Sequence, residues 1–123
     1  MIAYHGTNSD FQAFNKSLLG LNTKEAASDD ACFQTSLLGF WFSSSAEGPA
    51  ANYERVITCE IELNNPLYID DLASLINWLE CVGLEDVNKY LDDNNHDGII
   101  IQDDEEYGAS SFIVRDSAQI AIL

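Results

Sequence analysis

Basic residues are scarce in this chain of 123 residues: five Lys and Arg stand against 21 Asp and Glu, which gives a formal net charge of −16. A surface of this sign repels phosphate backbones and anionic lipid headgroups, so we expect the protein to bind neither nucleic acid directly nor a membrane. The same charge suits a protein that binds a basic protein target, including a host complex that itself binds nucleic acid.

Long apolar runs, a secretion signal and spaced metal ligands are missing as well. No stretch approaches the roughly 18 apolar residues of a membrane-spanning helix, and no signal peptide opens the chain. The three cysteines, Cys32, Cys59 and Cys81, are odd in number and lack metal-ligand spacing, which predicts free thiols in a reducing cytoplasm. The sequence also has no phosphate-cradling glycine loop and no nucleophile elbow.

What remains is the composition of a folded domain. Hydrophobic residues make up 46% of the chain and aromatic residues 11%, which is enough to bury a core. The chain has only two prolines, no internal repeat and no low-complexity linker, so we expect residues 1–123 to form a single domain.

The hydrophobic pattern predicts an α+β domain with strands towards both ends and helices between them. Alternating apolar and polar residues over 55–63 indicate a strand with one buried face. Asp70 or Asp71 is expected to cap an amphipathic helix that Gly83 ends, and a second helix follows. The other expected elements are strands at 2–5, 40–42, 67–69, 99–101, 112–114 and 119–123, and a short helix that carries Ala46, Ala50, Ala51 and Tyr53.

Three segments carry residues that can bind a ligand. Tyr4-His5-Gly6-Thr7 combines imidazole nitrogens, which bind hydroxyl groups, with a glycine that allows close approach to the backbone. Segment 39–45 (Gly-Phe-Trp-Phe-Ser-Ser-Ser) and Tyr53 can form two aromatic walls around a flat, positively charged ring. The third segment, 95–116, holds an acidic run at 103–106 between two expected strands. Each segment taken alone is also explained by core packing or by solvation.

Taken together and in this order, the segments resemble the ADP-ribosyltransferase superfamily, in its diphtheria-toxin and poly(ADP-ribose) polymerase branch with a histidine, tyrosine, glutamate signature. The chain is most similar to the small phage-type transferases, including those inside phage polyvalent proteins and those that act as anti-CRISPR factors. The pieces that carry the resemblance span nearly the whole chain: His5-Gly6-Thr7, Gly39 to Phe42 with Ala50-Ala51-Asn52-Tyr53, Asn65-Pro66-Leu67, Asp97 to Ile100, and Phe112 to Ile120.

The resemblance implies an ADP-ribosyltransferase-like fold: two small, roughly orthogonal β-sheets with flanking short helices and a central cleft that binds NAD as the substrate. His5 would hold a ribose hydroxyl, and the Gly6 backbone would bind the nicotinamide carboxamide. Trp41 and Tyr53 would sandwich the nicotinamide ring. The full set implied to contact NAD is His5, Gly6, Thr7, Trp41, Phe42, Ser43 and Tyr53.

The implied reaction is mono-ADP-ribosyl transfer to a macromolecular target, with a protein as the expected acceptor. Loss of nicotinamide leaves an oxocarbenium-like sugar, which a nearby carboxylate would stabilise. Trp41 stands where the family has its signature tyrosine, and Ser111 aligns with the expected glutamate. Among the nearby carboxylates Glu105 is our first choice and Glu106 the second, so the expected catalytic set is His5, Tyr53, Glu105 and Glu106.

Two other functions stay open at this stage. One is an acidic inhibitor that binds a basic nucleic-acid-binding protein and has a non-catalytic NAD cleft. The other is a calcium loop at 93–104, because Asp93, Asn95, Asp97 and Gly98 fit EF-hand spacing, although position twelve is aspartate and a strand is expected to follow. We assign no metal. The phage resemblance implies a factor that counters host defence in the host cytoplasm.

Overall fold

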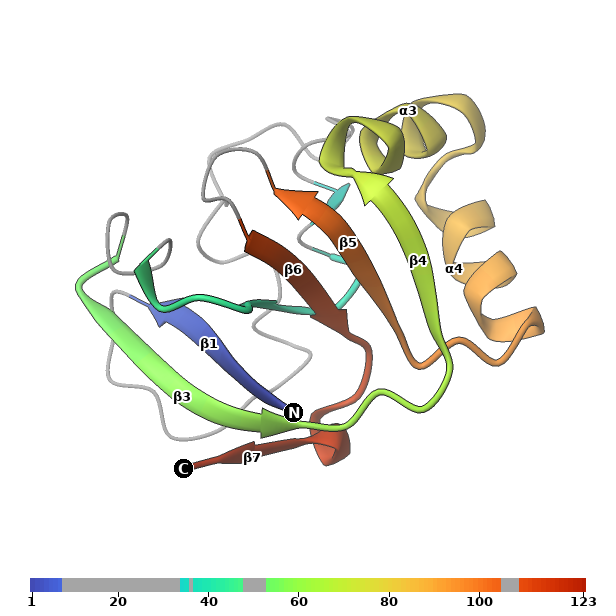
Figure 1. Ribbon diagram of the computed structural model, residues 1–123. Coiled ribbons are helices and arrows are strands. Elements are labelled where there is room, and N and C mark those ends of the chain that lie inside the picture. Colours follow the sequence, from blue (N-terminus) through green and yellow to red (C-terminus); the bar gives the residue numbers. More distant parts are fainter. Residues whose placement is uncertain (8–33, 36, 48–52, 105–108) are drawn as a thin grey trace.

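The computed structural model describes residues 1–7, 34–35, 37–47, 53–104 and 109–123. Its described part is an α+β domain, which confirms the predicted class; both helices lie beside β4 and β5, away from β3 and β7 (Figure 1). The elements are β1 (Ile2–Thr7), β2 (Phe40–Ser43), β3 (Arg55–Ile61), β4 (Pro66–Asp71), α3 (Leu72–Val82), α4 (Leu84–Asp93), β5 (Gly98–Asp104), β6 (Ala109–Val114), the 3-10 turn η3 (Ser117–Gln119) and β7 (Ile120–Ile122).

The described strands form one sheet, in the order β4-β5-β6-β2-β1-β3-β7, rather than the two sheets expected. Only β4 and β5 are parallel; all other neighbours are antiparallel. The sheet is continuous because β1 and β2 pair, but they share a single register pair, Tyr4 with Ser43, whereas β1 and β3 share six. In Figure 1, β4 and β5 run at a steep angle to β7. A four-stranded half and a three-stranded half therefore meet at a thin junction.

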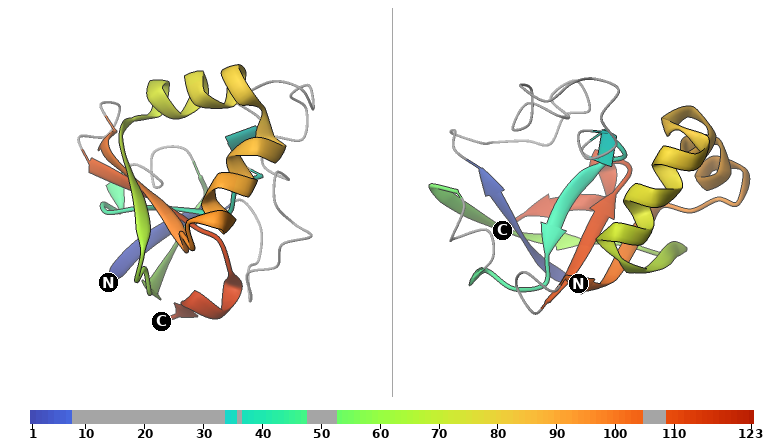
Figure 2. Two further views of the ribbon diagram at one scale, coloured as in Figure 1. Left: turned by 90° about the vertical axis from the view of Figure 1, so that its right-hand side faces the viewer. Right: turned by 90° about the horizontal axis from the view of Figure 1, so that it is seen from above.

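The two faces of the sheet carry separate hydrophobic clusters. We call the face that carries α3 and α4 the helix face (Figure 2) and the other the opposite face. Neighbouring residues of a strand point to opposite faces, so in β2 the ring of Phe42 belongs to one cluster and that of Trp41 packs against the other. The helix-face cluster contains Leu38, Leu75, Leu79, Val87, Leu91, Ile99, Ile101 and Ile113; the opposite-face cluster contains Ala3, Phe40, Phe42, Cys59, Ile61, Phe112 and Val114.

Local sequence signals fix both ends of α3. The carboxylate of Asp71 accepts a hydrogen bond from the backbone N–H of Ser74 at 2.8 Å, which confirms Asp71 as the N-cap. At the other end Gly83 has φ 85°, and its N–H donates to the carbonyl of Leu79 at 2.8 Å, so the helix ends at the glycine as predicted. Within the described part of the chain, neither helix has the length and apolar character to cross a membrane.

A network of hydrogen bonds around Asp97 joins three connections of the fold. Its carboxylate accepts from the backbone N–H groups of Asn64 at 2.6 Å and Asn65 at 3.0 Å. The side chain of Asn65 donates to two carbonyls of the α4–β5 turn, and that of Gln119 donates to the carbonyls of Glu62 and Asp97. Three of the five pieces that carry the family resemblance thus meet here, and their polar residues hold the backbone in place.

Strand β5 and the hydrogen bonds of Asp97 contradict the calcium-loop interpretation of residues 93–104. Gly98–Asp104 is strand β5, paired with β4 on one side and β6 on the other. A strand of this length extends roughly 20 Å, so position twelve cannot return to the start of the loop. The carboxylate of Asp97 already accepts two backbone hydrogen bonds. Among the described residues, no group of three or more His, Cys, Asp or Glu is arranged to hold a metal ion.

Candidate functional site

His5 ties β1 to β2 at the thin junction of the sheet. Its Nδ1 lies 2.7 Å from the carbonyl oxygen of Trp41. Because a carbonyl only accepts, Nδ1 carries the hydrogen of the neutral ring. The imidazole also contacts the ring of Phe42, with centroids 5.6 Å apart and planes tilted by 53°. His5 therefore has a structural bond to β2; its role toward a ribose stays a prediction.

The environment of His5 lowers its pKa below the ordinary value of 6.5, because burial disfavours the charged ring; the hydrogen bond to Trp41 acts in the other direction and is the smaller effect. At neutral pH the imidazole is therefore neutral. A neutral ring keeps Nδ1–H as the donor to the carbonyl of Trp41.

This lowered pKa predicts a loss of stability in mild acid. Below pH 6.5 the unfolded chain binds a proton at His5 that the folded chain does not bind, so the free energy of unfolding falls as pH decreases until the folded pKa is passed. His5→Asn keeps an amide N–H near the position of Nδ1 and does not titrate. Urea unfolding at about pH 7.5 and about pH 5.5 should show a smaller pH difference for the variant than for the wild type. Equal pH differences would contradict the prediction.

The ring of Tyr53 lies directly on Gly6. A Cβ built at Gly6 would stand 2.3 Å from Cδ2, 2.7 Å from Cγ and 3.0 Å from Cε2 of that ring, so only glycine leaves room for it. These distances place the added Cβ above the face of the ring, next to Cδ2, and the side chain of Tyr53 is only partly buried. One face of the Tyr53 ring therefore lies on Gly6. Since Ala3 and His5 belong to the opposite face, Gly6 and the ring on it belong to the helix face.

A row of polar residues crosses three strands on the helix face beside Gly6. Tyr4 of β1 pairs with Ser43 of β2, and Ser43 pairs with Ser111 of β6. Residues directly opposite one another share a face, so these three side chains are neighbours. Ser43 and Ser111 are 8% and 6% exposed, and the hydroxyl of Ser43 accepts from the N–H of Ser45 at 3.1 Å. Ser111, which replaces the expected glutamate, thus lies within the candidate site.

Trp41 lies on the same face, two residues before Ser43 in β2. Its indole Nε1 donates to the carbonyl of Thr35 at 2.9 Å, and the ring packs against the helix-face cluster. Trp41 and Tyr53 therefore occupy one face of the sheet, with the row through Ser43 crossing that face. That the two rings sandwich a nicotinamide stays a prediction.

The other expected contact residues divide between backbone and core. Thr7 is 3% exposed at the end of β1, where it pairs with Arg55. Phe42 is also 3% exposed, and its ring points into the opposite-face cluster, so it supports His5. Glu105, Glu106 and the Ala50-Ala51-Asn52 part of the short helix lie outside the described residues. The sequence did not predict that Tyr4 lies beside Ser43, because this depends on the register between β1 and β2. It did not predict Thr35 as the hydrogen-bond partner of Trp41 either, because this depends on a tertiary contact.

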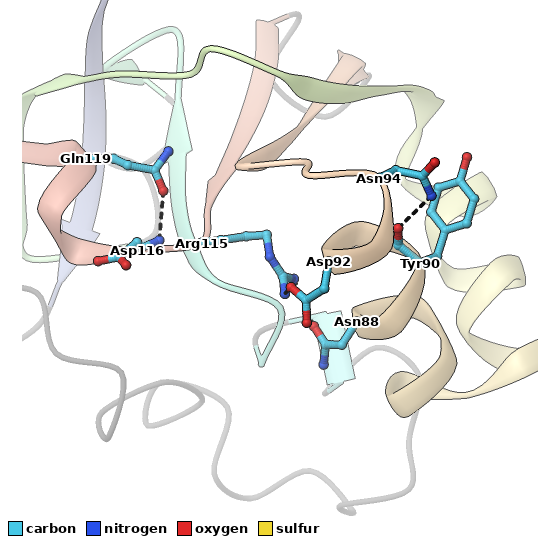
Figure 3. Close-up of polar contacts among 7 residues, drawn as sticks. All are labelled: Asn88, Tyr90, Asp92, Asn94, Arg115, Asp116 and Gln119. Atoms are coloured by element: carbon cyan, nitrogen blue, oxygen red, sulfur yellow. Dashed lines mark hydrogen bonds and ion pairs between the residues drawn. The ribbon is translucent and has the colours of Figure 1, made fainter.

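One of the two arginines of the chain is engaged in the fold, as Figure 3 shows. The guanidinium of Arg115 donates to Asn88 Oδ1 and to Asp92 Oδ1, both at 2.9 Å, and its side chain is 17% exposed. It clamps α4 onto the end of β6. The pocket of about 450 Å³ around it is lined mainly by acidic residues, including Glu62 and Asp116. This pocket is therefore unsuited to a pyrophosphate, and a dinucleotide would depend on stacking, ribose hydrogen bonds and backbone amides.

Comparisons of the chain with family models, with curated proteins and with solved structures found no match. The interpretation of the site therefore depends on its geometry and on the sequence pattern.

Proposed function

We propose that the protein is an NAD⁺-dependent mono-ADP-ribosyltransferase that modifies a macromolecular target, with a protein as the acceptor. The observation that carries the proposal is the packing of Tyr53 on Gly6, on the face of the sheet that also carries Trp41 and the row through Ser43. Two pieces of the sequence that carry the resemblance, and that are far apart along the chain, thereby come together around the residues expected to bind nicotinamide.

The residues around Gly6 fit a flat, cationic ring. One face of the Tyr53 ring lies on Gly6, and the proposal assigns stacking on nicotinamide to its other face. Ser43 has a small side chain with a hydroxyl group that accepts from the N–H of Ser45 and can donate its own hydrogen to a carboxamide oxygen or a ribose oxygen. Stacking and cation–π attraction favour a positively charged nicotinamide over the neutral product, which supports its bound form before cleavage. The partly buried setting strengthens these interactions.

The proposal assigns the stabilising carboxylate to Glu105, with Glu106 as second choice. Cleavage of the glycosidic bond moves its electron pair to nicotinamide and leaves positive charge on the ribose, which a carboxylate stabilises until the nucleophile of the target attacks. The strand position that would hold a glutamate is occupied by Ser111, which cannot provide this charge. The carboxylate must then come from the segment before β6.

The test measures two products from NAD⁺ labelled in the adenine moiety and, separately, in nicotinamide: label transferred to proteins of a bacterial lysate, and free nicotinamide. We expect wild type to give both. Glu105→Gln and Tyr53→Ala should each lower the rate by about 100-fold, because each removes transition-state charge stabilisation or ring positioning. Glu85→Gln changes the same charge on an exposed residue of α4 and should leave the rate unchanged.

The outcomes separate the assignments. If wild type neither releases nicotinamide nor labels protein, the transferase proposal fails. If Glu105→Gln stays active and Glu106→Gln does not, the carboxylate is Glu106. If Glu85→Gln loses activity as well, net charge and not a particular carboxylate determines the rate.

A second candidate is an acidic inhibitor of a basic, nucleic-acid-binding protein, which the net charge of −16 favours. Complementary charge accelerates association and is screened by salt. Binding to such a target that survives Tyr53→Ala but weakens steeply with added salt would favour this function. Binding or labelling that Tyr53→Ala abolishes would favour the transferase.

A further inference from the structure

A groove runs along strand β4 at the margin of the sheet. It has a volume of about 500 Å³ and lies between β4 and the two helices. Residues 67–70 form its strand side, and Ser74, Trp78 and Tyr90 form its helix side. We call it the β4 groove. It is separate from the site around Gly6, because β5, β6 and β2 stand between β4 and β1.

The strand side of this groove is a sheet edge. β4 is the first strand in the order of the sheet and pairs only with β5 among the described elements. An edge strand offers a row of backbone N–H and C=O groups to any further extended segment. Addition of a strand to such an edge is a recurrent way to bind a peptide, in which the backbone supplies affinity and adjacent side chains supply selectivity.

The helix side of the groove presents ordered aromatic rings. Trp78 and Tyr90 meet edge to face, with centroids 5.3 Å apart and planes at 87°, and Tyr90 stacks on His96 at 6.1 Å and 28°. Tyr90 is 45% exposed, and Tyr68 on the strand is 61% exposed. Rings that are mutually supported and yet exposed provide contact area at a low cost in side-chain entropy.

The acidic residues of the β4 groove favour a positively charged ligand. Asp70 lines it, and Asp71 follows at the start of α3, where hydrogen bonds from Ser74 lower the pKa of its carboxyl and keep it ionised. None of the described lining residues is basic. Carboxylates beside exposed aromatic faces attract lysine and arginine through ion pairing and cation–π contact.

We propose that the β4 groove binds an extended basic segment of a partner protein, which adds to the sheet as a further strand beside β4. Alternate side chains of that segment reach the aromatic rings and the others reach solvent and Asp70. The proposal does not depend on the transferase reaction: it concerns how a basic target is held and stands whether or not NAD⁺ is cleaved.

The test is an NMR titration of the ¹⁵N-labelled protein, without NAD⁺, with an eight-residue peptide of alternating lysine and valine. Backbone amides of residues 67–71 and the indole N–H of Trp78 should shift in a saturable manner. Two control peptides separate the contributions. The same sequence with every backbone nitrogen methylated keeps its charge and loses its strand hydrogen bonds, so it should bind at least about tenfold more weakly. Alternating glutamate and valine should not bind.

Variants localise the interaction. Asp70→Asn should weaken the lysine–valine peptide by about threefold, and Tyr90→Ala by more, since the first removes an exposed charge and the second a contact ring. Glu85→Gln is the matched control and should have no effect; circular dichroism verifies that each variant is folded. Equal affinity for the methylated peptide, or shifts spread over the acidic surface, would overturn strand addition. Shifts of residues 67–71 that grow with protein concentration alone would replace the peptide by a second copy of the chain.

Discussion

Replacing Gly98 by alanine is expected to lower the free energy of unfolding by about 3 kcal/mol, which is the upper part of the range for forcing an atom into a packed site. The added Cβ would stand 2.4 Å from the carbonyl oxygen of Ile113 and 2.5 Å from Cδ2 of Leu63. The oxygen belongs to the backbone of β6, which pairs with β5 at this point, so it cannot move without breaking the sheet. Urea unfolding followed by far-ultraviolet circular dichroism measures the loss.

Gly83→Ala provides the comparison for this prediction. A Cβ at Gly83 meets no atom within 4 Å, but φ 85° and ψ 162° form a combination that is essentially restricted to glycine, so alanine adds only backbone strain, which costs about 1–3 kcal/mol. The steric account requires the larger loss at Gly98. If Gly83→Ala lowers the free energy of unfolding more than Gly98→Ala does, the close approach of Gly98 to β6 is not the reason for a glycine at this position.

Gly6→Ala is expected to abolish activity while leaving the protein folded. Here the neighbour of the added Cβ is the ring of Tyr53, which can rotate away, so the stability loss should be only about 1 kcal/mol. The displaced ring can no longer stack on nicotinamide, so under the proposed function nicotinamide release should fall by about 100-fold. A nicotinamide-release assay and urea unfolding on the same preparation measure both quantities.

A double variant makes this prediction independent of activity. With Tyr53→Ala in place, the clash at Gly6 has no partner, so Gly6→Ala should then cost markedly less stability than in the wild-type background. Additive losses in the two backgrounds would show that Tyr53 does not rest on Gly6 in solution. Full activity of Gly6→Ala would instead contradict the assignment of Tyr53 to nicotinamide stacking.

The secondary structure was largely predictable because its signals are local. The cap at Asp71, the break at Gly83 and the alternation that leads to the buried Cys59 each depend on a few neighbouring residues. The number of sheets was not predictable in this way. Whether two halves are joined depends on one pair, Tyr4 with Ser43, and no periodicity along either strand encodes that contact.

The candidate site was predictable only in part. His5 and Gly6 are adjacent in the sequence, but strand alternation sends them to opposite faces. The pairing of Ser111 with Ser43 depends on register between strands far apart in the chain. Asp97 shows the converse error: its spacing fitted a calcium ligand, while its carboxylate in fact accepts hydrogen bonds from the backbone N–H groups of Asn64 and Asn65, between β3 and β4.

The position of β3 determines when this protein can fold during synthesis. In the described sheet β3 lies between β1 and β7, the first and the last of the described strands, and the N–H of Leu123 donates to the carbonyl of Thr58 at 3.0 Å. Until β7 has left the ribosome tunnel, β3 is paired on one side only. Completion of the three-stranded half therefore joins parts of the chain that are distant in sequence, and contacts of this kind are slow to form. Before β7 pairs, the nascent chain has an exposed edge at β3, and this edge is a defined segment for chaperones to protect.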